Sequence, residues 1–296
     1  MKNFRLFQKH LPALCSVFLF CLLLATNSSH ARGLLDNLNN MDLSKLEQVG
    51  QKLAQSSEKS EDEEMEIGEH MAGTLVGAVP LDNNSKAQAY VNKVGRWLSL
   101  HSERPDIPWQ FGVLNDNDLN AFAAPGGYVF ITRGLLNTLD NEAELAGVLA
   151  HEIQHVTHKH YLKAAQKNNL IGAASDIGMM LGNSSGRSSA QQREINERLL
   201  NASKQLYARG LDKDDEFEAD RDALQLMTRA GYDPYAFVAV MQKLDAHGAS
   251  DSKMALLLAT HPSPADRLVS LGASINTLKI PANTATLESR FQQALR

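Results

Sequence analysis

The sequence contains very little cysteine. Of its 296 residues only two are cysteines, Cys15 and Cys21, and both lie in an apolar segment near the N-terminus. The rest of the chain therefore has no disulfide to stabilise it, even in an oxidising compartment. Neither cysteine follows the small residue expected at the cleavage site of a bacterial lipoprotein, because Leu14 and Phe20 stand there. A lipid anchor is therefore disfavoured.

Long hydrophobic runs are also missing. The apolar stretch ALCSVFLFCLLLA has 13 residues, fewer than the ~20 that a membrane-spanning helix needs. It follows a start with three basic residues and no acid, and it precedes a small-residue exit that ends at Ala31. This pattern predicts a signal peptide over residues 1–31, in preference to an uncleaved membrane anchor.

A second apolar segment, residues 170–181, has 12 residues and contains Asp176. It is too short to span a membrane, and we expect a buried or lid-like helix. The polar, small-residue stretch over residues 182–193 predicts a mobile loop, suited to gating a cleft or to being cut.

Basic residues do not dominate the charge. The formal net charge is −5, and it becomes −8 without the three basic residues of the predicted signal peptide. We therefore expect no nucleic-acid partner, since phosphate binding needs a basic face. Seven acids fall between Glu58 and Glu69, which favours a solvated linker or an exposed helix face. Composition thus divides the chain into a signal peptide (1–31), an N-terminal helix and acidic linker (32–65), a packed domain (66–275) and a tail with a short helix (276–296).

The packed domain has the pattern of an α+β fold that is mainly helical. Apolar residues recur at three- and four-residue spacing over residues 66–80 and 84–100, which predicts two helices. Three segments then alternate and are rich in aromatic and branched residues: IPWQFGVLN, LNAFAAP and GGYVFITR. Pro125, Gly126 and Gly127 predict the turn between the last two strands, so we expect a small antiparallel sheet.

A helix after this sheet carries the segment AGVLAHEIQHVTHKH. Asn141 and Glu144 form a capping-box pattern at its start. The apolar positions form one buried stripe: Leu145, Val148, Leu149, Ile153 and Val156. His151 and His155 are one turn apart, so both imidazoles can reach one metal ion. Glu152, rotated by about 100°, would lie beside the open coordination position, where a water-activating base belongs.

A third metal ligand must come from elsewhere in the chain. One design with a downstream glycine and histidine is excluded, because those positions hold His158 and Tyr161. We interpret His158 and His160 as facing solvent or as contacting a metal-binding side chain without binding the metal themselves. A helix over residues 215–229 places Glu216 and Asp220 on one face, so Glu216 could bind the ion and Asp220 could orient a ligand histidine. A charged exposed face remains the alternative.

Five segments, read in order, strengthen the metal hypothesis: NAFAAPGGYVFITRGLL, ELAGVLAHEIQHV, EFEAD, AGYDP and THPSPADR. They resemble metallopeptidase family forty-eight, gluzincins of the HtpX and CAAX prenyl endopeptidase type, over residues 64–272. The likeness is greatest to soluble, secreted bacterial members, although the chain leaves no room for a tetratricopeptide array. It implies a zincin-like core with the small sheet beside the active-site helix.

The resemblance also implies roles for individual residues. His151, His155 and Glu216 become zinc ligands, Glu152 the catalytic base and Asp220 the supporting acid. It further offers two donors for the transition-state oxyanion, His261 and Arg267, although His261 could instead be a fourth zinc ligand that closes the site. Substrate would lie along an edge strand near Asn120, Ala121 and Phe122.

These features predict an endopeptidase with one zinc ion per chain. Its expected substrates are unfolded or misassembled cell-envelope proteins, in periplasmic quality control near envelope assembly machinery, and it could be peripheral at a membrane. Two alternatives stay open. The domain could be a zinc-binding holdase with latent or incidental proteolysis, or a helical scaffold without metal.

Overall fold

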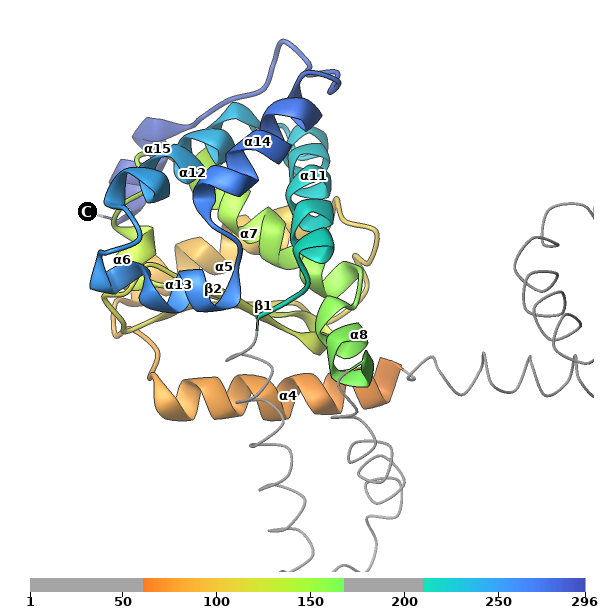
Figure 1. Cartoon of the computed structure of the whole chain (residues 1–296). Helices are drawn as coiled ribbons and strands as arrows, with labels where there is room; N and C mark the ends of the chain where they lie inside the picture. Colours follow the sequence, from red (N-terminus) through yellow and green to blue (C-terminus); the bar gives the residue numbers. More distant parts are fainter. Residues whose placement is uncertain (1–60, 168–209, 296) are drawn as a thin grey trace, which may run out of the picture. The chain divides into compact units, whose positions relative to one another are not determined.

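The computed structural model describes residues 61–167 and 210–295 (Figure 1). The predicted signal peptide, the apolar segment 170–181 and the loop 182–193 lie outside the described residues. The described elements follow the order α4 Glu61–Ala78, α5 Ser85–Ser99, β1 Gln110–Leu114, β2 Ala121–Ala124, a 3-10 turn Pro125–Gly127, β3 Tyr128–Thr132, α6 Arg133–Leu136, α7 Glu142–Thr157, α8 His160–Lys167, α11 Lys213–Arg229, α12 Tyr235–His247, a 3-10 turn Ser252–Met254, α13 Ala255–Thr260, α14 Pro264–Ile275 and α15 Glu288–Leu295. The predicted α+β class with mainly helical content is confirmed.

The three strands form a mixed sheet, which corrects the expected antiparallel one. The strand order is β1-β3-β2, with β3 parallel to β1 and antiparallel to β2. The tight turn that joins β2 to β3 contains two glycines with positive φ, Gly126 and Gly127. The turn makes β3 antiparallel to β2, and β2 runs opposite to β1. Because β3 lies between the other two strands, it pairs with β1 in the parallel direction. Alternation along each strand carries no information about this order.

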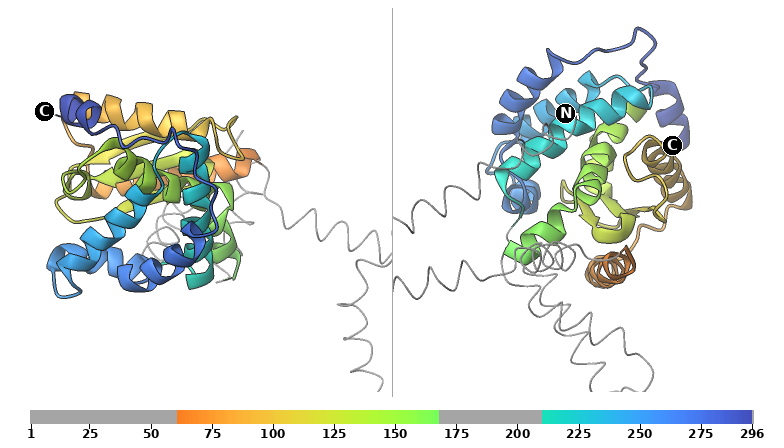
Figure 2. Two further views of the ribbon diagram at one scale, coloured as in Figure 1. Left: turned by 90° about the horizontal axis from the view of Figure 1, so that it is seen from above. Right: turned by 90° about the vertical axis from the view of Figure 1, so that its right-hand side faces the viewer.

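Helices cover both faces of the sheet, as Figure 1 shows, with α4 below it and α7 above it. Side chains alternate between the faces. Phe122 and Phe130 join Leu75 of α4 in a small cluster, whereas Val129 and Ile131 belong to the larger core formed with α5 and α7. The right-hand view of Figure 2 shows α4 nearly end-on beneath the sheet.

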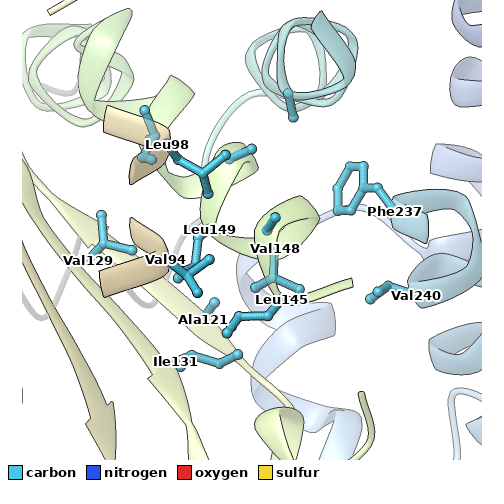
Figure 3. Close-up of a cluster of buried hydrophobic side chains, with 14 of the residues drawn as sticks. Val94, Leu98, Ala121, Val129, Ile131, Leu145, Val148, Leu149, Phe237 and Val240 are labelled. Atoms are coloured by element: carbon cyan, nitrogen blue, oxygen red, sulfur yellow. The ribbon is translucent and has the colours of Figure 1, made fainter. Parts of the chain in front are cut away.

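Helix α7 lies at the centre of the domain, and its residues from Glu142 to Val156 are all buried. α11 and α12 pack against it, and α14 packs against both of those helices (Figures 1 and 2). Figure 3 shows α7 side chains, such as Leu145 and Val148, between those of the sheet and Phe237 of α12. Because the sheet, α11 and α12 all pack on α7, the polar side chains of this helix are held in fixed surroundings.

The acidic segment is helical where the structure describes it, since α4 begins at Glu61. The expectation of solvated acids is wrong for Glu64, whose carboxylate is buried. Arg104 donates two hydrogen bonds to Glu64, at 2.6 and 3.1 Å, and Lys159 lies 3.2 Å from it. Burial would raise the pKa of Glu64, but Arg104 and Lys159 outweigh it and hold that pKa below its ordinary value.

None of the helices in the two described ranges is long and apolar enough to cross a membrane.

Candidate metal centre

The start of α7 is fixed by reciprocal hydrogen bonds. The side-chain oxygen of Asn141 accepts from the backbone N–H of Glu144 at 3.0 Å, and the Glu144 carboxylate accepts from the N–H of Asp140 at 2.8 Å. The predicted helix start is confirmed, with the carboxylate bonding one residue further back than in a standard capping box. The cap fixes where α7 begins, and packing against the sheet and α12 leaves His151 and His155 facing α11.

Four side chains converge from two helices, α7 and α11, and from the residue that follows α13. The Nε2 atoms of His151 and His155 are 3.0 Å apart. Glu216 of α11 places Oε2 3.6 Å from Nε2 of His151 and Oε1 3.6 Å from Nε2 of His155. His261, directly after α13, brings its Nδ1 to 2.8 Å from Glu216. All four residues are buried, and their ligand atoms lie within 4.8 Å of one another.

This donor set fits a metal ion. Ligand atoms about 2.1 Å from a tetrahedral zinc ion are about 3.4 Å from each other, and the observed 3.0 and 3.6 Å lie close to that separation. Glu216 Oε1 is buried and finds no hydrogen-bond partner within residues 61–167 and 210–295. An unpaired buried carboxylate oxygen is costly, and a cation bound among these groups would remove that cost.

Asp220 and Arg267 stand behind His151. Asp220 lies 2.9 Å from Nδ1 of His151, a distance at which a carboxylate can orient this ring. Arg267 of α14 donates to both carboxylate oxygens of Asp220, at 2.5 and 3.0 Å. The guanidinium of Arg267 lines the same cavity as Glu152, but two of its nitrogens donate hydrogen bonds to Asp220.

Glu152 lies beside the four converging residues and has a free carboxylate oxygen. Its Oε2 is buried and has no hydrogen-bond partner in the part of the chain that the structure describes. A cavity of about 20 Å³ adjoins it, lined in part by His151, His261, Arg267 and Ala121. That volume accommodates about one water molecule and excludes a peptide. The Glu152 carboxylate is thus placed to accept a proton from a water molecule in this cavity.

Electrostatics separate the ionisable groups of this centre. Burial raises the pKa of Glu152, which favours its action as a proton acceptor and donor near neutral pH. Burial also lowers the pKa of His155 well below its ordinary value, so that ring is neutral and has a free lone pair. Burial and Arg267 oppose protonation of His151, but hydrogen bonds to Asp220 and Glu216 raise its pKa to about 9.

The three residues expected along an edge strand have different surroundings. β2 is an edge strand of the sheet, and Ala121 lines the cavity beside Glu152. Phe122 belongs to the cluster on the α4 face. Asn120 is buried and its Nδ2 has no partner. The structure therefore places Ala121 beside Glu152 and turns Phe122 toward α4. All four residues of β2 are buried.

His158 and His160 have different positions. His158 is partly exposed and lies 3.0 Å from Asp222. His160 is fully buried, and its Nδ1 lies 2.9 Å from Nδ1 of His155. Of the two expectations for these histidines, contact with a ligand residue holds for His160. Helical spacing left both interpretations open for His160, because α7 ends before this residue and Lys159 has a left-handed backbone conformation.

Comparison with known proteins adds independent information. Residues 85–275 match the sequence profile of Peptidase family M48. The chain is 31% identical over 223 residues to the Beta-barrel assembly-enhancing protease of Escherichia coli O157:H7 (73% of this chain, 45% of that protein). It is 32% identical over 249 residues to the protein of the same name from Yersinia pestis (79% and 48%). Mitochondrial metalloendopeptidase OMA1 of Schizosaccharomyces pombe is 33% identical over 180 residues (60% and 50%). The chain spans about half the length of these curated relatives.

Proposed function

Because the chain belongs to Peptidase family M48, we propose that it is a zinc-dependent endopeptidase. The observation that carries the proposal is the convergence of His151, His155 and Glu216 beside the unpartnered carboxylate oxygen of Glu152. A structural metal site has no use for a free carboxylate at its side. The alternative of a metal-free scaffold gives no reason to bury these groups together.

In the proposed mechanism, His151, His155 and Glu216 hold one zinc ion. When bound, zinc supplies Lewis acidity, which polarises a carbonyl group and makes water more acidic. Glu152 accepts the proton of the attacking water and returns it to the leaving amine. Asp220 holds the ring of His151 through Nδ1 at 2.9 Å, and Arg267 holds Asp220 in turn.

His261 is proposed to close the resting site as a fourth ligand. Its Nδ1 lies 2.8 Å from Glu216, among the groups that could share one ion. The narrow cavity of about 20 Å³ beside Glu152 supports this proposal, because an extended peptide does not fit into it unless a neighbouring element moves. The competing role of His261 is donation to the transition-state oxyanion, which Arg267 could share.

The proposed substrates are unfolded polypeptides bound along β2. An extended chain that adds to an edge strand is recognised mainly through its backbone, so side-chain selectivity is weak. Ala121 places this strand beside Glu152. Because β2 is covered, the same opening that admits substrate to the metal must also expose the strand.

The proposed setting is protein quality control in the bacterial envelope. The N-terminal pattern of residues 1–31 favours export to the periplasm, and two relatives are named for enhancing β-barrel assembly. Misassembled envelope proteins are then the substrate class. A zinc-binding holdase is the second candidate, and it differs in having no need for Glu152.

A metal-exchange experiment with an unfolded substrate tests the proposal. We expect the purified chain to cleave a reduced, alkylated protein that cannot refold, and to cleave the same protein much more slowly in its folded form. A chelator should abolish cleavage, and one equivalent of zinc should restore it. Cleavage that survives complete removal of metal would refute the zinc mechanism, and equal cleavage of both forms would refute the substrate class.

A further inference from the structure

The two histidines that face the proposed zinc ion are supported differently. His151 contacts the buried carboxylate of Asp220 directly, at 2.9 Å. Among the described residues, the partner of His155 Nδ1 is another imidazole, Nδ1 of His160, which lies 2.9 Å away. The far nitrogen of His160, Nε2, lies 3.2 Å from Glu218 and 3.7 Å from Asp215.

We propose that His160 is a positioning residue, which fixes the ring of His155 and connects it to the carboxylates of Glu218 and Asp215. The inference rests on the proposed function, since it concerns how a zinc ligand is held. His160 touches neither the ion nor the substrate, so its effect passes through His155.

Hydrogen-bond roles determine the tautomers along this chain of residues. Carboxylate oxygens accept and do not donate, so Nε2 of His160 carries the hydrogen that points to Glu218. Nδ1 of a neutral His160 is then an acceptor, and His155 must donate to it from Nδ1. This leaves Nε2 of His155 without hydrogen, with its lone pair directed at His151 and Glu216. The arrangement thus selects the tautomer that binds metal through Nε2.

A turn between α7 and α8 places His160. Lys159 has a φ of 56°, a left-handed conformation that non-glycine residues seldom adopt. The Lys159 side chain pairs with the buried Glu64 at 3.2 Å, which ties the turn to α4. His160 then begins α8, and its side chain has no exposed surface. An unfavourable backbone conformation with a specific ion pair is consistent with a position that the fold must maintain.

Zinc affinity measured by competition with a chromogenic chelator tests this role on the full chain. His160→Phe keeps an aromatic ring but removes both nitrogens, and we expect it to raise the zinc Kd by about 10- to 100-fold. His158→Phe is the matched control, because His158 stacks on His160 at 5.4 Å but bonds to Asp222 instead of His155. Its Kd should stay within about threefold of the native value, a bound set by the smaller effect expected of a partly exposed residue.

Rescue separates positioning from simple packing. His160→Asn places an oxygen acceptor near the former Nδ1, so we expect it to bind zinc more tightly than His160→Phe. In long-range ¹H–¹⁵N spectra of the zinc-loaded native protein, His155 should carry its hydrogen on Nδ1. A hydrogen on Nε2 would overturn the inference.

The outcomes distinguish the inference from the proposed function. If the native chain binds no zinc, the proposed function fails first. If the native chain and His160→Phe bind zinc equally tightly, only the role of His160 is wrong. Should His160→Phe not fold, the pair of substitutions Glu218→Gln and Asp215→Asn replaces it. A weaker zinc affinity in that variant supports the connection, and an unchanged affinity refutes it.

Discussion

Single residues at the metal centre have distinct physical tasks, although all of them are buried. Glu216 has one oxygen paired with His261 and one without a partner, whereas both oxygens of Asp220 are occupied by Arg267. An occupied carboxylate orients its neighbours, and an unoccupied one is available to a cation. Hydrogen-bond occupancy therefore separates the proposed ligand from the proposed supporting acid on the same helix face.

Removal of His261 tests whether this residue closes the site. We expect His261→Ala to cleave an unfolded substrate several-fold faster than the native chain, because one coordination position becomes free. Zinc content should remain near one ion per chain, since three ligands remain. Initial rates at saturating substrate provide the measurement. A fall in rate with zinc retained would instead assign His261 to the oxyanion.

Elements that are distant in sequence meet at α7, and Gly147 permits a close contact with α12. A Cβ atom at Gly147 would lie 2.8 Å from Cβ of Phe237 on α12. Phe237 also packs against His151, with ring centroids 5.9 Å apart. The separation of α7 and α12 therefore affects the position of a proposed ligand.

Gly147→Ala should destabilise the fold by about 1–3 kcal/mol, because an added methyl group overpacks this contact. Gly73→Ala in α4 is the matched control, since nothing lies within 4 Å of the added atom. That change should stabilise the helix by about 0.5–1 kcal/mol. Urea unfolding gives both values. Equal effects at the two glycines would show that α12 does not constrain α7 as described.

Most elements could be predicted from local sequence, but their assembly could not. The 3.6-residue periodicity and the Asn141 cap predict α7, and alternation predicts all three strands. The order of the strands depends on where β3 pairs, which no single strand records. The facing of Glu216 toward His151 followed from spacing combined with the resemblance. The sequence left open whether His160 faces solvent or contacts His155, because the answer depends on the left-handed conformation of Lys159.

At the scale of the whole molecule, Glu142 joins the first and last parts of the domain. This buried residue at the start of α7 accepts hydrogen bonds from Tyr90 of α5, Tyr232 and Arg290 of α15. Burial would raise the pKa of Glu142, but Arg290 and the two tyrosines outweigh it and lower that pKa below its ordinary value. The predicted C-terminal tail is thereby bound to the active-site helix.

This network makes stability depend on acid. A carboxyl group whose folded pKa is lowered contributes stability that is fully present above its unfolded pKa of about 4.5 and is lost as pH falls below that value. We expect the free energy of unfolding of the metal-free chain to decrease from pH 5 toward pH 3. In Glu142→Gln this decrease should be smaller, because one titrating group is gone. Identical slopes for the two proteins would contradict the assigned role of Glu142.

The central claim concerns Glu152, and it is tested by cleavage of an unfolded protein with zinc measured on the same samples. The native chain, Glu152→Gln and Glu142→Gln form the set, and the last is a control for loss of a buried glutamate on α7. We predict about one zinc ion in each, near-native cleavage by Glu142→Gln and a loss of about 10²- to 10⁴-fold in Glu152→Gln. Native-like cleavage by Glu152→Gln would contradict the mechanism, and zinc without cleavage in all three would favour the holdase.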